Sequence, residues 1–176
     1  MNTSARVIGN HAFFVREGDT STTPAGDVSK LLKPDVDDPS WINLGVIEQA
    51  GIEYQSEEKE VWQPSPGQLR LADVIEVKRG LKLSFTVKEM SALMFELMFG
   101  TEALTDASTQ YNPLEGTTKK GWLKLQQYDH HDAIVNTTDV YVHLKVSSEV
   151  SLGDDVATFE IEARVLHSTL NTGTLA

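Results

Sequence analysis

Apolar and polar residues alternate along much of the chain, which is the pattern of strands with one buried face and one wet face. The clearest runs span residues 81–88, 140–146 and 158–165, and weaker runs span 12–16, 42–54, 73–77 and 122–128. The strand within 42–54 is expected to continue toward Val61-Trp62. Gly153-Asp154-Asp155 lies between two clear runs and predicts a hairpin turn. The pattern therefore predicts a mainly β fold.

Residues 89–99 break this alternation and predict one α-helix. Glu89 favours the N-terminal end of a helix dipole, and Gly100 is a natural C-terminal stop. The residues at helical spacing are Met90, Leu93, Met94 and Leu97, and those that widen the apolar surface are Phe95, Met98 and Phe99. A helix this apolar must be covered on more than one side. We therefore expect it to flank the sheet, across an open face or at the end of a barrel.

Two segments have the composition of long loops within a single domain that spans residues 1–176. Residues 17–40 are rich in Gly, Thr, Asp and Pro and predict an N-terminal arm or loop. Residues 55–71 carry a charged run and then two prolines and a glycine. This second segment is interpreted as a projecting loop, either the tip of a projecting hairpin or a mobile loop.

Charge and cysteine content exclude several classes of function. The chain has 176 residues and a formal net charge of −11, from 26 acidic and 15 basic residues. Such a surface repels DNA phosphates and anionic membranes, although it suits a protein that lets DNA pass without binding it. The chain has no cysteine, so disulfides, thiolate nucleophiles and cysteine-ligated zinc are excluded. It contains neither an apolar run long enough for a membrane helix nor a signal peptide, so we expect no membrane contact.

Catalytic and ligand-binding motifs are missing from the sequence. It contains no phosphate-binding glycine loop, no dinucleotide fingerprint and no nucleophile elbow, so we assign no catalytic, cofactor-binding or metal-binding residues and expect no enzyme and no cofactor. The cluster Asp129-His130-His131-Asp132 could bind a metal, but neighbouring strand residues point to opposite faces, and a polar turn is the favoured interpretation. His143 lies on the polar side of a strand and is interpreted as a solvent or interface residue. The three tryptophans are interpreted as core or interface anchors.

The segment Ser40-Trp41-Ile42-Asn43-Leu44-Gly45-Val46-Ile47-Glu48 resembles the opening strand of many phage tail tube proteins, with its tryptophan followed by Leu-Gly. The later elements follow the order of that family. A long strand is expected over 52–61, a strand over 81–87 leads into a helix rich in Leu and Met, and further strands close the domain between 122 and 165. The resemblance covers about residues 40–165 and rests on order and pattern, with Trp-x-x-Leu-Gly as its local motif.

The resemblance implies a β-sandwich or barrel-like domain with a flanking helix. It also implies hexameric rings that stack into a hollow tail tube through which DNA passes without specific binding. The partners would be other copies of the chain and other tail proteins, and the location would be the virion tail, assembled in the cytoplasm of the bacterial host. The candidate subunit-interface residues are Trp41, Leu44, Gly45, Glu57, Glu58, Lys59, Glu60, Trp62, Pro64 and Pro66.

Three alternatives remain open at the level of the sequence. The chain could be another ring-forming virion protein, such as a tail terminator or a head decoration protein. It could also be a tube protein of the type VI secretion kind, which the pattern separates poorly from the phage version. A ligand-binding or enzymatic β-barrel is the alternative from another class, and it would need a pocket with convergent polar groups.

Overall fold

The computed structural model describes residues 9–88, 93, 94, 97, 119–146 and 158–175. Within these residues strands are the dominant secondary structure, as the alternating pattern predicts. The strands are β1 (Gly9–Arg16), β2 (Ile42–Ser65), β3 (Gln68–Val87), β4 (Lys119–Tyr128), β5 (Ile134–Val146), β6 (Phe159–Val165) and β7 (Thr172–Leu175). The prediction of a mainly β fold is confirmed.

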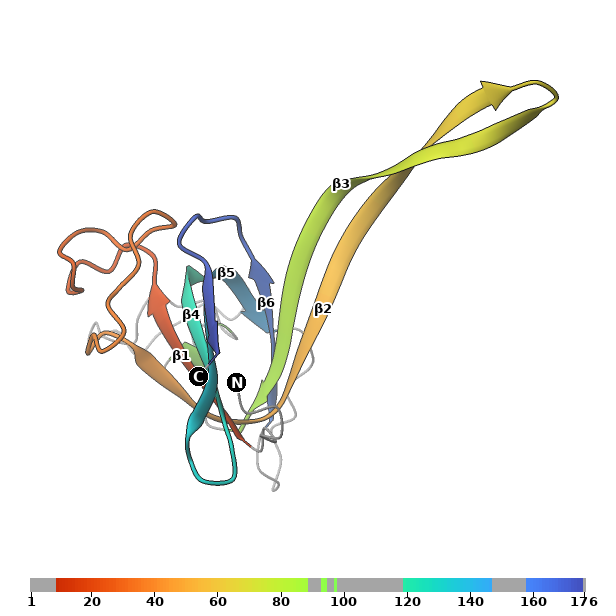
Figure 1. The fold of residues 1–176 in the computed structure, drawn as a ribbon. Helices are drawn as coiled ribbons and strands as arrows, with labels where there is room; N and C mark the ends of the chain where they lie inside the picture. Colours follow the sequence, from red (N-terminus) through yellow and green to blue (C-terminus); the bar gives the residue numbers. More distant parts are fainter. Residues whose placement is uncertain (1–8, 89–92, 95–96, 98–118, 147–157, 176) are drawn as a thin grey trace.

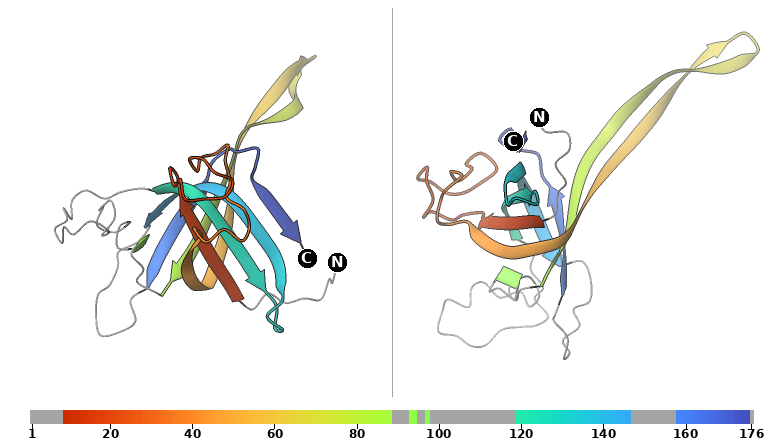
Figure 2. Two further views of the ribbon diagram at one scale, coloured as in Figure 1. Left: turned by 90° about the vertical axis from the view of Figure 1, so that its left-hand side faces the viewer. Right: turned by 60° about the horizontal axis from the view of Figure 1, so that its bottom comes forward.

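The strands form an antiparallel sheet that closes on itself. Their order is β4-β1-β2-β3-β6-β5-β7, and an additional pairing of β4 with β5 closes the sheet into a barrel. β5 changes neighbour along its length. Its residues 142–146 pair with β6, and its residues 136–139 pair with β7. Closure removes the free strand edges that an open sheet would expose (Figures 1 and 2).

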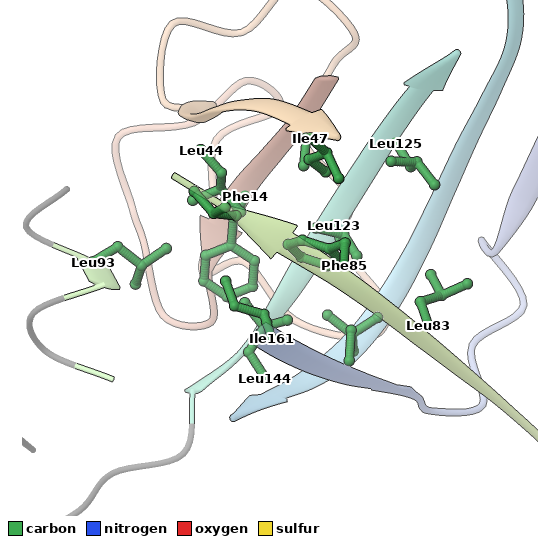
Figure 3. Close-up of a cluster of buried hydrophobic side chains, with 14 of the residues drawn as sticks. Phe14, Leu44, Ile47, Leu83, Phe85, Leu93, Leu123, Leu125, Leu144 and Ile161 are labelled. Atoms are coloured by element: carbon green, nitrogen blue, oxygen red, sulfur yellow. The ribbon is translucent and has the colours of Figure 1, made fainter. Parts of the chain in front are cut away.

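The barrel is filled by the apolar half of each alternating strand (Figure 3). Leu83, Phe85 and Val87 are buried in β3, while the side chains between them face outward. The other strands contribute inward residues in the same way, including Phe14, Leu44, Ile47, Leu123, Leu125, Leu144 and Ile161. Burial of these side chains is the main force that holds the domain together.

The predicted helix at 89–99 is described in part. Leu93, Met94 and Leu97 are helical and buried against the barrel core, and the other residues of the segment lie outside the described part of the chain. These three residues have the inward positions that helical spacing assigns to them. None of the helical residues that are described belongs to a segment long and apolar enough to cross a membrane.

β2 and β3 are far longer than the barrel and continue beyond it as a two-stranded hairpin (Figure 1). They pair from Ile47↔Val87 to Ser65↔Gln68, with Pro66-Gly67 as the turn. Gly67 has a φ of 81°, which glycine adopts without strain. We call residues 55–80 the arm. Residues 55–71, interpreted as a loop or a hairpin tip, are strand on both sides of this turn, because a hairpin with two wet faces tolerates polar residues at every position.

Residues 17–41, which we call the outer loop, connect β1 to β2 and pack against the outside of their own barrel. Val28 is buried with Val15, Trp122 and Tyr141 in a second apolar cluster. The indole Nε1 of Trp122 donates hydrogen bonds to the carbonyl oxygens of Ser29 (2.9 Å) and Leu32 (3.2 Å). The predicted loop at 17–40 is therefore anchored on the domain that carries it.

Candidate assembly surfaces

The arm projects far from the barrel as a ribbon with solvent on both faces (Figures 1 and 2). The part of β2 that belongs to the arm runs from Gln55 to Ser65. At about 3.3 Å per residue, it extends roughly 35 Å beyond the barrel. β1 pairs with β2 only up to residue 47, and β6 pairs with β3 only from residue 82. Among the described residues, no strand lies along either edge of the arm. A two-stranded ribbon of this kind is marginally stable by itself.

The register of β2 and β3 divides the side chains of the arm between two faces. Bulges at Ala72 and Val77 add one residue each to β3, and each addition reverses the alternation. As a result, one face of the outer arm collects large apolar residues, and we call it the tip face. Its apolar members are Trp62, Pro64, Leu69, Leu71 and Val74.

The tip face exposes apolar and acidic groups side by side. Trp62 is 50% exposed and Leu69 is 64% exposed. Toward the barrel the same face carries Glu58 and Glu60, and Glu60 accepts a hydrogen bond of 3.0 Å from the Trp62 indole. Glu76 also lies on this face and forms an ion pair of 2.7 Å with Arg79.

The opposite face of the arm is more evenly charged. Lys78 forms an ion pair with Glu57, and closer to the barrel Lys82 forms one of 2.6 Å with Glu53. The hydrogen bond from Lys82 holds the pKa of the Glu53 carboxyl below its ordinary value, and the lysine charge adds to the effect. This face also exposes two smaller apolar side chains, Val61 at 39% and Ile75 at 48%, beside its charged groups.

A groove of about 410 Å³ lies beside the outer loop, and we call it the loop groove. Its lining comes from the outer loop, from β4 and β5 and from the segment after β6: Glu17, Ser29, Lys30, Leu31, Lys120, Tyr141, Leu166 and His167. Tyr141 is buried, and its hydroxyl is hydrogen-bonded to Glu17. Burial is the largest cause of the raised pKa of Tyr141, and the hydrogen bond and the charge of Glu17 add to it. Lys30 and Lys120 are exposed at the groove.

The wall of the loop groove is held firmly in place. Ser29 and Leu32 exchange backbone hydrogen bonds of 3.2 and 3.1 Å across a tight turn. The carbonyl oxygens of both residues also accept hydrogen bonds from the Trp122 indole. The Ser168 hydroxyl donates a hydrogen bond of 2.5 Å to the carbonyl oxygen of Lys30. Leu31 lies at this anchored turn and is still 72% exposed. The fold therefore fixes a large apolar side chain in solvent.

The second half of the outer loop is held by charged side chains. The Asp38 carboxylate accepts hydrogen bonds from the Ser40 hydroxyl and from the backbone N–H groups of Thr23 and Ser40, and these bonds lower its pKa. Lys33 forms an ion pair of 3.0 Å with Asp139 of β5. These contacts fix the loop along the barrel wall.

Lys124 of β4 is the deepest charged contact of the outer loop. The side chain is 3% exposed, and its Nζ donates a hydrogen bond of 2.6 Å to the carbonyl oxygen of Val36. The same Nζ lies 4.0 Å from the centroid of the Trp41 ring, which is a cation–π geometry. Burial lowers the pKa of Lys124.

The predicted interface residues divide into three groups. Glu57, Glu58, Lys59, Glu60, Trp62, Pro64 and Pro66 are exposed on the arm. Trp41 is partly buried against its own loop, where its indole donates a hydrogen bond of 2.8 Å to the Asp35 carbonyl. Leu44 is 1% exposed in the core, and Gly45 beside it is buried with a φ of 90°. A neighbouring subunit cannot touch Leu44, so its assignment to an interface is corrected to the core.

The polar cluster at 129–132 is the turn between β4 and β5. The Asp129 side chain accepts hydrogen bonds from the backbone N–H groups of His131 (2.8 Å) and Ala133 (3.0 Å), and Asp132 has a φ of 59°. These are the contacts of a polar turn, which the sequence favoured. Within the described residues, no group of three or more metal-ligating side chains comes together.

Several surface residues escaped sequence reasoning. Leu69, Leu71 and Val74 are not among the predicted interface residues. Only Val74 is hidden by a bulge, the one at Ala72, whereas alternation continued across the Pro66-Gly67 turn places Leu69 and Leu71 opposite Pro64 and Trp62. Leu31 carries no sequence signal, because its exposure depends on contacts between the outer loop and distant strands.

Comparison with known proteins identifies the fold. No protein-family model and no curated protein matches the chain. A chain in the cryo-EM structure of the anti-feeding prophage baseplate, symmetrised six-fold, matches with a TM-score of 0.53 and 12% identity over 95% of both chains. A chain in the tail of an empty gene transfer agent particle, refined with C6 symmetry, has a TM-score of 0.43 and 12% identity over 86% of this chain and 99% of that one. The first likeness shows a shared fold.

Proposed function

We propose that this protein is a structural subunit of a phage-tail-like particle and that its copies form rings, six to a ring, that stack into a hollow tail tube. The observation that carries the proposal is the arm, which extends apolar surface and unpaired strand edges away from the barrel. A soluble monomer rarely maintains such a surface unless a partner covers it. The fold shared with a chain of a six-fold symmetrised baseplate supports the same role.

The arm gives each copy two ways to contact the next. Near the barrel, the edges of residues 51–56 and 79–81 can pair with strands of a neighbour in the ring. Farther out, the tip face can reach the surface of another copy. A contact of different surfaces that closes produces a ring, and repetition along an axis produces a tube. The net charge of −11 would let DNA pass through the channel without a binding minimum.

A second candidate is a subunit of a single ring within the same kind of particle. It is favoured by the fold shared with a chain of the anti-feeding prophage baseplate structure. A baseplate subunit or a tail terminator would form rings that do not stack without limit. The length of the assemblies therefore separates the two candidates.

An arm-shortened variant tests the role of the arm. Residues 57–78 are removed and Ser56 is joined to Arg79 through Asn-Gly, which keeps the native Ser56↔Arg79 register and supplies a two-residue turn. We expect a folded monomer, because the removed residues contribute nothing to the barrel core. Sedimentation velocity should show large particles for the wild type and monomers for the variant. Assembly of the shortened chain at wild-type concentrations would contradict the proposal.

A further inference from the structure

We propose that the tip face of the arm binds in the loop groove of a second copy of this chain. The inference rests on the proposed function and adds to it the surface that receives the arm. Both surfaces expose large apolar side chains. The tip face presents Trp62, Leu69 and Leu71, and the groove presents Leu31 and Leu166. Half-exposed tryptophans of this kind are frequent anchors at protein interfaces.

The charges of the two surfaces are complementary. On the tip face, Glu58 and Glu60 follow the apolar residues toward the barrel. At the loop groove, Lys30 and Lys120 flank the exposed leucine, and the one lining carboxylate, Glu17, is bonded to the Tyr141 hydroxyl. A tip seated on Leu31 would therefore place two carboxylates near two ammonium groups. Opposite charges at the rim of an apolar contact favour encounter and fix its register.

The arm cannot reach the loop groove of its own chain. The outer loop and the arm leave the barrel in different directions, as the views in Figures 1 and 2 agree. β2 and β3 are paired continuously to the turn apart from the bulges, so the ribbon does not fold back. The contact must join two copies.

The outer arm is built for contact through a face and not through an edge. Pro64 has no N–H to donate on the β2 edge, and the bulges at Ala72 and Val77 interrupt the β3 edge. Prolines and bulges are features by which proteins prevent strand addition. A partner is therefore left with a face of the arm, and the tip face carries the bulkier exposed apolar side chains, Trp62, Leu69 and Leu71. Leu31 suits it because the backbone of its turn is already ordered before binding, which lowers the cost of ordering.

Charge reversal tests the contact. The arm variant carries Glu58→Lys and Glu60→Lys, and the groove variant carries Lys30→Glu and Lys120→Glu. Each should raise the protein concentration for half-maximal assembly by at least roughly tenfold, because like charges then meet. The chain with all four changes should recover to within about threefold of the wild type. Asp73→Lys, on the opposite face of the arm, is the control and should assemble normally.

Disulfide trapping gives an independent readout, because the natural chain has no cysteine. Leu69→Cys and Leu31→Cys are made in separate chains, mixed and oxidised, and they should give a cross-linked heterodimer. Val36→Cys is the control, since it is 59% exposed on the same outer loop but does not line the loop groove. It should cross-link to Leu69→Cys far more slowly.

The outcomes separate this inference from the function on which it rests. The contact would be established by three results: weaker assembly of the arm variant and of the groove variant, recovery of assembly in the chain with all four changes, and faster cross-linking of Leu69→Cys to Leu31→Cys than to Val36→Cys. If the wild type assembles, but the reversals have no effect or Val36→Cys cross-links as fast as Leu31→Cys, the docking is wrong and the proposed function stands. If the wild type does not assemble and no cross-link forms, both are wrong.

Discussion

At the residue scale, Gly121 shows how tightly the barrel wall is packed where β4 pairs with both β1 and β5. A Cβ added there would lie 2.0 Å from the carbonyl oxygen of Val15 and 2.7 Å from Cζ of Phe14. Backbone cannot move aside without breaking the pairing of β1 with β4. The position therefore requires glycine for space, while its φ is ordinary for any residue.

The substitution Gly121→Ala should destabilise the domain by at least about 2 kcal/mol, because overpacking at this point displaces a strand. The control is Gly173→Ala in β7, where an added Cβ has nothing within 4 Å. Urea unfolding followed by tryptophan fluorescence measures both. Equal unfolding midpoints for the two variants would contradict the prediction, because they would mean that β1 and β4 accommodate a Cβ at residue 121.

Residue patterns predicted the buried side of each strand well. Leu83 and Phe85, Val142 and Leu144, and Ile161 all point into the core, as a period of two requires. The prediction is wrong for Leu44, which belongs to the Trp-x-x-Leu-Gly motif and is expected from the sequence to lie at a subunit interface. Its burial depends on the barrel closing around β2, and no local pattern reports that closure.

At the scale of elements, the outer loop shows how a long irregular segment becomes part of a rigid surface. Composition predicted a loop at 17–40, and the structure has one. Its fixed path depends on Trp122, Lys124 and Ser168, which are far away in the sequence. Contacts of such long sequence separation could not be derived from composition.

Trp122→Phe should loosen the outer loop while the barrel stays folded. The phenyl ring keeps most of the apolar contact with Val28 and Tyr141 but cannot donate to the carbonyl oxygens of Ser29 and Leu32. Each of these two carbonyls keeps its backbone hydrogen bond but loses its second one, at a combined cost of about 1–2 kcal/mol. Amide hydrogen exchange within 28–33 should therefore accelerate by roughly tenfold. Exchange that accelerates equally in β6 would instead indicate global destabilisation.

The arm is the opposite case, because it is a regular hairpin whose amino-acid composition is typical of a loop. Pro66-Gly67 marked the turn, and Gly67 occupies the position that needs a positive φ. The charged run at 57–60 suggested a loop, although charged residues are compatible with strand when both faces are wet. The ion pairs of Glu57 with Lys78 and of Glu53 with Lys82 lie across the two strands and support the hairpin.

At the scale of the whole molecule, the domain combines a closed barrel with an arm that contributes no residue to the barrel core. Closure of β4 onto β5 hides the edges of the barrel strands, whereas the arm leaves its edges and its tip face exposed. The pairing order of the strands was not predictable from the sequence, because β1 lies between β2 and β4 through contacts distant along the chain. The tail tube resemblance implied a β-sandwich or barrel-like domain, and the closed sheet and the shared fold agree with it.

Negative-stain electron microscopy of the wild-type protein across a range of concentrations tests the central proposal most directly. A tail tube subunit should form rings with an open centre that stack into hollow tubes, whose length increases with concentration. Monomers at every concentration, or single rings that never stack, would contradict a tail tube subunit.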